Sequence, residues 1–207
     1  LTEPRSVAVR GEQVLVGTGD GRVLVLDRAG AIVREIGGFS AVDEILVAPE
    51  GSSTDGQVVV VDRARSMVAP VKLDDGEHLA SLRAGNGVTQ AVVDPAGRIL
   101  ASNTRDGEIL GFYGQPIVMR FRYPVPQSPY ALTYDAVRNV LWVATTADNQ
   151  AVAYDLASGM PVERGRFATV GQVTAMTSAE GSGLLYLLSG RGDGLQAVSP
   201  HLPNAGA

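Results

Sequence analysis

A four-segment pattern that recurs about every 42 residues limits the fold of this chain more than any other feature. The clearest copy has short apolar or alternating runs at residues 128–135, 140–144 and 150–155, then a fourth extended run from 161 to 167. Equivalent landmarks in the preceding copy lie 41 residues upstream for Asp94 and Asp135, and 42 upstream for Phe112 and Tyr154. Because two separate landmarks keep the same register, the similarity indicates a structural repeat.

Three further copies complete a single predicted domain over residues 1–207. The predicted repeat spans are 4–36, 41–83, 88–123, 129–167 and 173–199. The second copy carries a Gly/Ser/Asp insertion at 51–56, and its last segment, 77–83, suits either a short helix or a strand. We predict a strand from its place in the repeat. The fifth copy has three recognisable segments.

The segments read as β-strands joined by tight turns. The run 58–61 is four valines, which is typical of a strand covered on both faces. Turns such as 19–21 and 105–107 carry the Gly and Asp residues that tight turns require. Four strands per repeat predict an all-β fold, a β-propeller of four-stranded antiparallel blades. A solenoid rung is usually shorter, and a stacked sandwich gives no reason for a repeat in register.

The fifth copy is short and only three residues precede the first strand, so we expect one or two further blades, making six or seven in the native protein.

Composition narrows the class of partner and the location. The net charge is −5 and the isoelectric point is near 5.0, which argues against nucleic acid as the partner. There is no cysteine, and no apolar run has the length of a membrane-spanning helix. The sequence starts at Leu1, so we expect a processed or trimmed N-terminus.

The fourth copy resembles the YVTN-repeat propellers, and the first and third copies resemble the related NHL-type repeats. The matching residues are Pro129, Asp135, Leu141-Trp142-Val143, Asn149, Val152, Asp155 and Ser158-Gly159. With sixteen arginines and one lysine, the chain also resembles envelope-anchored propeller lipoproteins of actinobacteria. Such a lipoprotein carries a lipidated cysteine, which would have to lie outside these residues. The resemblance implies an interaction or ligand-binding platform.

The turns between second and third strands should share one face of a propeller with the linkers between blades. This face is the candidate binding surface, because arginines clamp carboxylates or phosphates at two points. Its predicted members are Asp20, Arg63, Arg65, Asn103, Arg105, Asp106, Asp148, Asn149, Arg191 and Asp193. The alternative is that these residues serve turn geometry alone.

The proline-rich linker 123–130 adds Tyr123 and Tyr130 as candidate contacts, or else forms a stiff connector over the core.

Other polar residues carry structural interpretations. Asp94, Asp135 and Asp155 end strands and are predicted to accept hydrogen bonds from turn amides. The two histidines, His78 and His201, lack the neighbours that a catalytic triad or metal site needs. The Gly-rich run 17–21 joins two strands rather than opening a helix, so it is not a phosphate loop. We expect no catalytic residue, metal or cofactor.

The sequence therefore predicts a non-catalytic β-propeller that binds another protein or an envelope component. We expect an extracytoplasmic location at a bacterial cell envelope, with any lipid anchor outside this chain, and a cytoplasmic location is the alternative. The alternatives are a propeller enzyme of the lactonase or quinoprotein kind and a sensor-domain fragment of a receptor or kinase. Enzymes of the first kind hold a metal at the axis with oxygen ligands, whereas the first strands here begin with Ser6, Val42, Thr89-Gln90, Tyr130 and Thr174.

Overall fold

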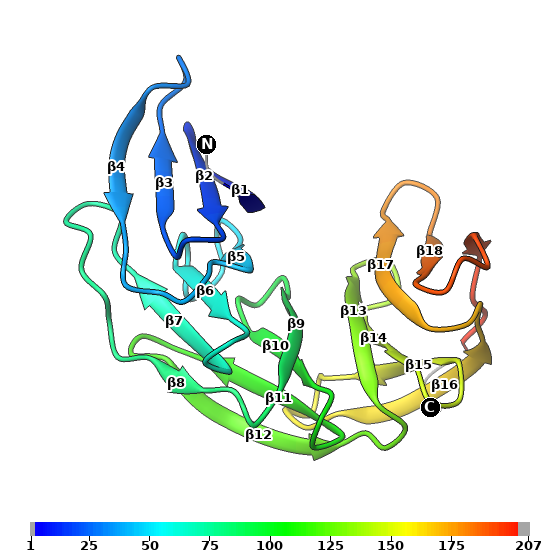
Figure 1. Cartoon of the computed structure of the whole chain (residues 1–207). Coiled ribbons are helices and arrows are strands. Elements are labelled where there is room, and N and C mark those ends of the chain that lie inside the picture. Colours follow the sequence, from blue (N-terminus) through cyan, green and yellow to red (C-terminus); the bar gives the residue numbers. More distant parts are fainter. Residues whose placement is uncertain (1–2, 203–207) are drawn as a thin grey trace.

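A computed structural model describes residues 3–202, and all regular structure in this part of the chain is β-strand (Figure 1). Nineteen strands form five antiparallel sheets, four of four strands and one of three. The first sheet contains β1 (Pro4–Arg10), β2 (Gln13–Thr18), β3 (Val23–Leu26) and β4 (Ile32–Ile36). The second contains β5 (Glu44–Val47), β6 (Val58–Asp62), β7 (Met67–Val71) and β8 (Leu82–Arg83). The third contains β9 (Val88–Val93), β10 (Ile99–Asn103), β11 (Glu108–Tyr113) and β12 (Val118–Pro124). The fourth contains β13 (Pro129–Asp135), β14 (Val140–Thr145), β15 (Gln150–Asp155) and β16 (Val162–Ala168), and the fifth contains β17 (Val173–Ala179), β18 (Leu184–Ser189) and β19 (Leu195–Val198).

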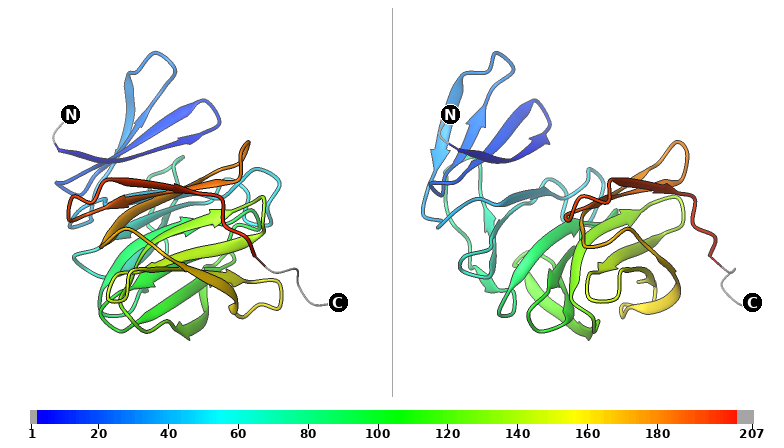
Figure 2. Two further views of the ribbon diagram at one scale, coloured as in Figure 1. Left: turned by 90° about the vertical axis from the view of Figure 1, so that its right-hand side faces the viewer. Right: turned by 45° about the vertical axis from the view of Figure 1, so that its right-hand side comes forward.

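Each sheet is a meander, because neighbouring strands follow one another in the sequence. The first strands of successive sheets, β1, β5, β9, β13 and β17, lie next to one another around a common centre. The five sheets form an arc that is open between the first and the fifth (Figure 1, and the right-hand view of Figure 2). The predicted β-propeller fold and its five repeats are confirmed, and we call the sheets blades 1 to 5.

Four hydrophobic clusters lie between successive blades. The second strand of an inner blade contributes to two of them: Val58 and Val60 face blade 1, whereas Val59 and Val61 face blade 3. All five residues of β6 and all six of β14 are buried. This explains why the sequence of these strands is apolar without alternation. The outer strands β4, β12 and β16 are mostly exposed, as their mixed polarity predicts.

Blade 2 departs from the repeat in its outer strand. The segment 77–83 is not helical, and β8 contains only Leu82 and Arg83, with a bridge from Val71 to His78 further along. Pro70 lies in β7, and its carbonyl accepts from the Leu79 amide, so its side without an N–H faces this segment. Asp75 accepts a hydrogen bond of 2.8 Å from the Glu77 amide and closes a turn there. The predicted strand is therefore present but short.

The insertion in blade 2 contacts blade 3. Thr54 is buried and donates a hydrogen bond of 3.2 Å to the Gly97 carbonyl, and Ser53 bonds the Tyr113 hydroxyl. The insertion is thus part of the contact between two blades.

The three strand-ending aspartates behave as predicted. Asp94 accepts from the Ala96 and Arg98 amides, Asp135 from the Arg138 amide, and Asp155 from the Ala157 amide. Asp135 also accepts from the indole nitrogen of the fully buried Trp142 at 3.2 Å.

Within the described residues, no helix long and apolar enough to cross a membrane is found.

Candidate binding face

The turns between second and third strands lie beside the linkers between blades, as the repeat predicts. The Gly19 amide donates to the Glu3 carbonyl at 2.8 Å, and the Gly190 amide donates to the Gln172 carbonyl at 2.7 Å. In blade 3 the Thr104 amide donates a hydrogen bond to the Gly87 carbonyl, and in blade 4 the Ala147 amide donates one to the Gln127 carbonyl. We call this surface the loop face.

A buried polar residue ends the second strand of every blade and fixes the turn that follows. These residues are Thr18, Asp62, Asn103, Thr145 and Ser189. Ser189 shows the pattern: its hydroxyl donates to the Gly171 carbonyl of the linker at 2.6 Å and accepts from the Asp193 amide of the turn. The loop face is therefore held to the core by one internal hydrogen-bonding group per blade.

Several predicted site residues form hydrogen bonds or ion pairs with other residues of the loop face. Asp20 pairs with Arg22 at 2.7 Å, and Arg191 pairs with Asp193 at the same distance. These hydrogen bonds to arginine hold the pKa of both aspartates below the ordinary value. Asp148 accepts from the Thr145 hydroxyl. The turn-geometry interpretation accounts for these contacts.

The amide residues and Asp106 are used in the same way. The Asn149 side chain accepts from the Gln172 amide at 2.8 Å, and the buried Asn103 donates to Asp106 at 2.7 Å. Asp106 also accepts from Asn86, and hydrogen bonds from Asn103 and Asn86 lower its pKa. These residues join turn to linker.

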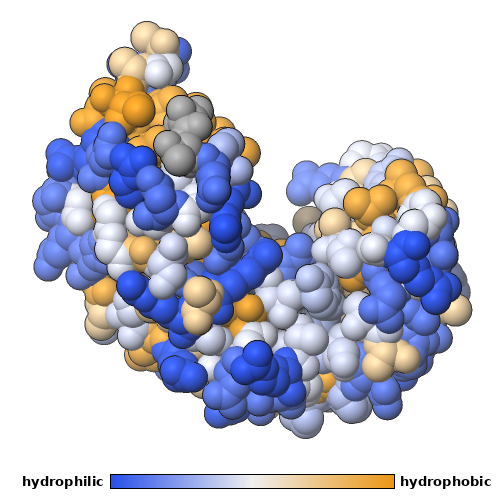
Figure 3. Space-filling model, viewed as in Figure 1, coloured by the Kyte–Doolittle hydropathy of each residue, from blue (hydrophilic) through white to orange (hydrophobic). Residues whose placement is uncertain are grey.

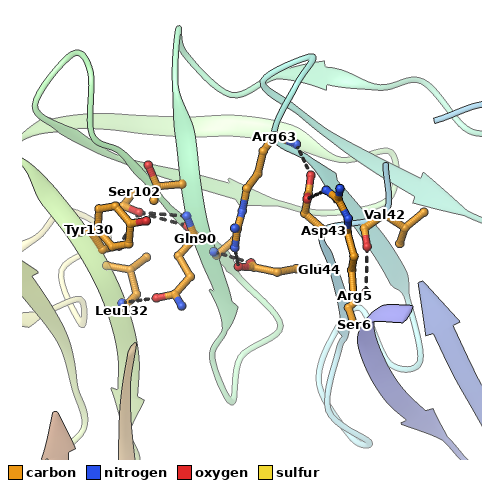
Figure 4. Close-up of polar contacts among 12 residues, drawn as sticks. Arg5, Ser6, Val42, Asp43, Glu44, Arg63, Gln90, Ser102, Tyr130 and Leu132 are labelled. Atoms are coloured by element: carbon orange, nitrogen blue, oxygen red, sulfur yellow. Dashed lines mark hydrogen bonds and ion pairs between the residues drawn. The ribbon is translucent and has the colours of Figure 1, made fainter. Parts of the chain in front are cut away.

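The two tyrosines of the linker lie at different depths. Tyr123 is half-buried in β12, packs against the cluster between blades 3 and 4, and meets Tyr154 edge-on with ring centroids 5.6 Å apart. Tyr130 packs against the cluster between blades 4 and 5, and its carbonyl accepts from Ser102 (Figure 4). Their role as partner contacts stays a prediction.

Three of the predicted arginines line one open hollow of about 1110 Å³ on the loop face. It spans blades 2 and 3 and reaches the linker to blade 4. Its lining is Arg63, Ala64, Arg65, Ser66, Arg83, Asn86, Gly87, Val88, Thr89, Thr104, Arg105 and Ser128. It therefore holds four arginines and no acidic residue. Arg83 was missed at the sequence level because the candidate residues were taken from the turns between second and third strands, whereas Arg83 ends the outer strand β8 next to the blade linker.

The four arginines differ in what they contact. Arg63 forms an ion pair of 2.7 Å with Glu44, and Arg65 donates to the Gly38 carbonyl at 2.6 Å and lies 3.8 Å from Asp62. The guanidiniums of Arg83 and Arg105 form no hydrogen bond or ion pair with any of the residues 3–202. Both side chains are exposed. The uncompensated positive charge of the hollow thus lies on the Arg83–Arg105 side.

Glu44, on the first strand of blade 2, contacts Arg63 of the hollow (Figure 4). Its carboxylate accepts 2.7 Å hydrogen bonds from the Ala91 amide of β9 and from Arg63. Burial nevertheless raises the pKa of Glu44 above the ordinary value, more than these two contacts lower it. Gln90 occupies the same register in blade 3 and accepts from the Leu132 amide of blade 4 at 2.9 Å. The pair connects three successive first strands.

The rest of the surface offers less to an anionic ligand. Two smaller cavities, of about 500 and 300 Å³, lie away from the loop face and have mixed or aromatic linings. The space-filling view shows the open arc, with hydrophilic residues over much of the visible face (Figure 3). Across residues 3–202, no three His, Cys, Asp or Glu side chains form a group that could hold a metal ion.

Solved structures share this fold, whereas no family model and no curated protein matches the sequence. Virginiamycin B lyase from Staphylococcus aureus is 16% identical with a TM-score of 0.69, over 99% of this chain and 72% of that one. The Cps50 (Swd1) β-propeller domain of Myceliophteria thermophila is 17% identical with a TM-score of 0.74, over 92% of this chain and 64% of that one. A chain of the mitotic checkpoint complex is 16% identical with a TM-score of 0.76, over 92% and 60%. At these identities the likeness shows the fold alone.

Proposed function

We propose that this chain is a non-catalytic β-propeller scaffold, and that its loop face binds another protein or an envelope component. The proposal includes the finer assignments made from the sequence: a YVTN- or NHL-type repeat protein, located outside the cytoplasm at a bacterial envelope, with any lipid anchor beyond these residues. The observation that carries it is the arginine-lined hollow, where two exposed guanidiniums have no hydrogen-bond or ion-pair partner among residues 3–202.

The turns of the loop face are held in place by hydrogen bonds, which supports a role of this face in binding. Each turn of the loop face is tied to the core by the buried group that ends its second strand. A surface that is ordered before contact loses less conformational entropy when a partner binds. Among the matched propellers, one is a chain of a mitotic checkpoint complex and another is BBS1N in complex with ARL6DN, so this fold carries protein contacts in other proteins.

The absence of cysteine from the sequence allows a direct test. A single cysteine is placed on the loop face, as Asp148→Cys, or in the β13–β14 turn at the far end of the blade, as Val137→Cys, where the side chain is exposed. Each is labelled with a photo-crosslinker and mixed with extract of the source organism. We expect one protein or envelope component to be captured from Cys at 148 and not from Cys at 137. Equal capture from both positions, or capture from 137 alone, would contradict the proposal.

An enzymatic role makes a different prediction. The fold is shared with virginiamycin B lyase, so virginiamycin B is the substrate to try first. We expect its concentration to stay constant when it is incubated with the purified chain. Turnover that increases with protein concentration would refute the non-catalytic assignment.

A further inference from the structure

We propose that the segment bound in the hollow is an acidic peptide of a protein partner, and that Arg83 and Arg105 hold its carboxylates. This inference rests on the proposed function and adds the chemical class of the ligand.

Arg63 and Arg65 are largely compensated by internal contacts. Arg63 neutralises the partly buried Glu44, and Arg65 bonds the Gly38 carbonyl near the fully buried Asp62. Arg83 and Arg105 make no such contact with the described part of the chain. An arriving anion therefore meets two unpaired guanidiniums, and it breaks no existing ion pair to reach them.

The backbone between these two arginines is fixed. Ser66 accepts from the Val88 amide at 3.0 Å, donates to the Ala84 carbonyl at 3.0 Å, and its own carbonyl accepts from the Ala84 amide at 2.7 Å. The linker that separates Arg83 from Arg105 is thus fastened to the β6–β7 turn near both ends.

Arg105 also has a defined path across this linker. A Cβ atom on Gly87 would lie 2.9 Å from the Cβ of Arg105 and 3.7 Å from its Nε, so the arginine stem packs directly over the glycine. The glycine therefore makes room for the side chain, and the position of the guanidinium follows from the linker that Ser66 holds.

The chemistry of the hollow favours carboxylates over phosphates. Phosphate sites in proteins usually present several free backbone N–H groups. Here three nearby amides are already bonded: Asn86 to Asp106, Val88 to Ser66, and Thr104 to Gly87. Arg83 and Arg105 each present a planar guanidinium fork, which matches a carboxylate at two points. The net charge of −5 further disfavours a ligand as densely charged as nucleic acid.

The size of the hollow indicates a segment rather than a single small ion. About 1110 Å³ is open to solvent, and the lining includes Thr89, Thr104 and Ser128 between and beside the arginines. Arg83 and Arg105 come from different blades, so they suit two carboxylates carried at separate positions on one extended chain.

The test measures binding of a labelled peptide by fluorescence anisotropy. The probe is a Glu/Gly peptide of about eight residues, roughly 26 Å when extended, and the comparison is the same peptide with Gln in place of Glu. The variants are Arg83→Ala/Arg105→Ala on the hollow and Arg28→Ala/Arg34→Ala on blade 1, which removes the same charge from exposed positions off the loop face. Arg63 is left unchanged because it compensates Glu44.

We expect the Glu peptide to bind and the Gln peptide not to bind. The hollow variant should weaken binding by about tenfold or more, the effect of losing charge-assisted contacts. The blade 1 variant should change affinity by less than about twofold. Equal weakening by both variants, or no binding of the Glu peptide, would overturn the inference.

Two competitors separate this inference from its alternatives and from the proposed function. Inorganic pyrophosphate or a short single-stranded DNA that displaces the probe at lower concentration than unlabelled Glu peptide would also overturn it. If cysteine at 148 captures a partner that the Glu peptide does not displace, the loop face is the binding surface and only the ligand class is wrong. If no capture depends on the loop face, the proposed function itself fails.

Discussion

Replacing Glu44 with alanine is expected to destabilise the fold by about 1–3 kcal/mol, and replacing it with glutamine by less than about 1 kcal/mol. Glu44 accepts a 2.7 Å hydrogen bond from the Ala91 amide, and Ala91 is 5% exposed. Water cannot replace the lost acceptor at such a depth, so alanine leaves a buried N–H group unpaired. Glutamine keeps a carbonyl oxygen at the same place and removes only the charge facing Arg63, which is 42% exposed and can be hydrated.

Urea unfolding followed by tryptophan fluorescence measures both free energies. Trp142 is the only tryptophan and is fully buried, so its emission reports loss of the core between blades 4 and 5. Gln90→Ala provides a parallel case, because it removes the acceptor of the Leu132 amide in the next pair of blades. Equal loss in Glu44→Ala and Glu44→Gln would refute the reasoning, since the charge rather than the buried amide would then decide the cost.

The same residue gives the stability a pH dependence of known sign. Burial raises the pKa of Glu44 in the folded chain above its ordinary value of 4.5. Above 4.5 the unfolded chain has released this proton while the folded chain still holds it, so stability falls as pH rises through the folded pKa. Below pH 4.5 the stabilising contribution of protonated Glu44 is fully present. Wild type should therefore gain stability relative to Glu44→Gln on acidification through this window, and a constant difference across it would show that burial does not dominate.

Two further predictions concern the packing between blades. Burial raises the pKa of Tyr154 to about 12, so stability should fall as pH rises from 10 toward 12 in wild type and fall less in Tyr154→Phe. Spectrophotometric titration should show one late-ionising tyrosine fewer in the variant, and its persistence would contradict the assignment. Gly17→Ala should cost about 1–3 kcal/mol, because its Cβ would lie 2.4 Å from the Val42 side chain and 2.8 Å from the Val42 carbonyl oxygen. Gly181→Ala, where no atom lies within 4 Å, is the matched control in thermal unfolding, and an equal loss there would point to backbone effects instead.

The strands could be predicted because each blade repeats the same local requirements. The register of Asp94 and Asp135 placed the third and fourth sheets within a residue or so, and the valines of β6 indicated burial on both faces. The outer strand of blade 2 was harder to predict. Pro70 removes a donor from the facing strand and Asp75 closes a turn, and these two local effects shortened β8 in a way that the repeat pattern alone does not carry.

The candidate site could be predicted only as a surface. Turn spacing placed Arg63, Arg65 and Arg105 on one face, and the structure brings them around one hollow. It did not indicate Arg83, because this residue ends an outer strand and belongs to no turn between second and third strands. Nor did it indicate the depth of Tyr123, because side chains alternate along an outer strand and its contact with Tyr154 comes from the next blade.

Ion pairing is the property that separates structural from available charge on this surface, and it depends on distances rather than on composition. Arg191 and Arg105 occupy comparable turns: the guanidinium of Arg191 lies over the linker residue Gly171, and the stem of Arg105 lies over Gly87. Arg191 forms an ion pair of 2.7 Å with Asp193 of its own turn. In the other turn, Asp106 accepts hydrogen bonds from Asn103 and Asn86 instead. Because these asparagines occupy the carboxylate, Arg105 is left without an acceptor in the described part of the chain. An exchange such as Asn86→Ala, which frees part of Asp106, would allow the carboxylate to turn to Arg105. The availability of the hollow to a ligand therefore depends on Asn86 as well as on the arginines themselves.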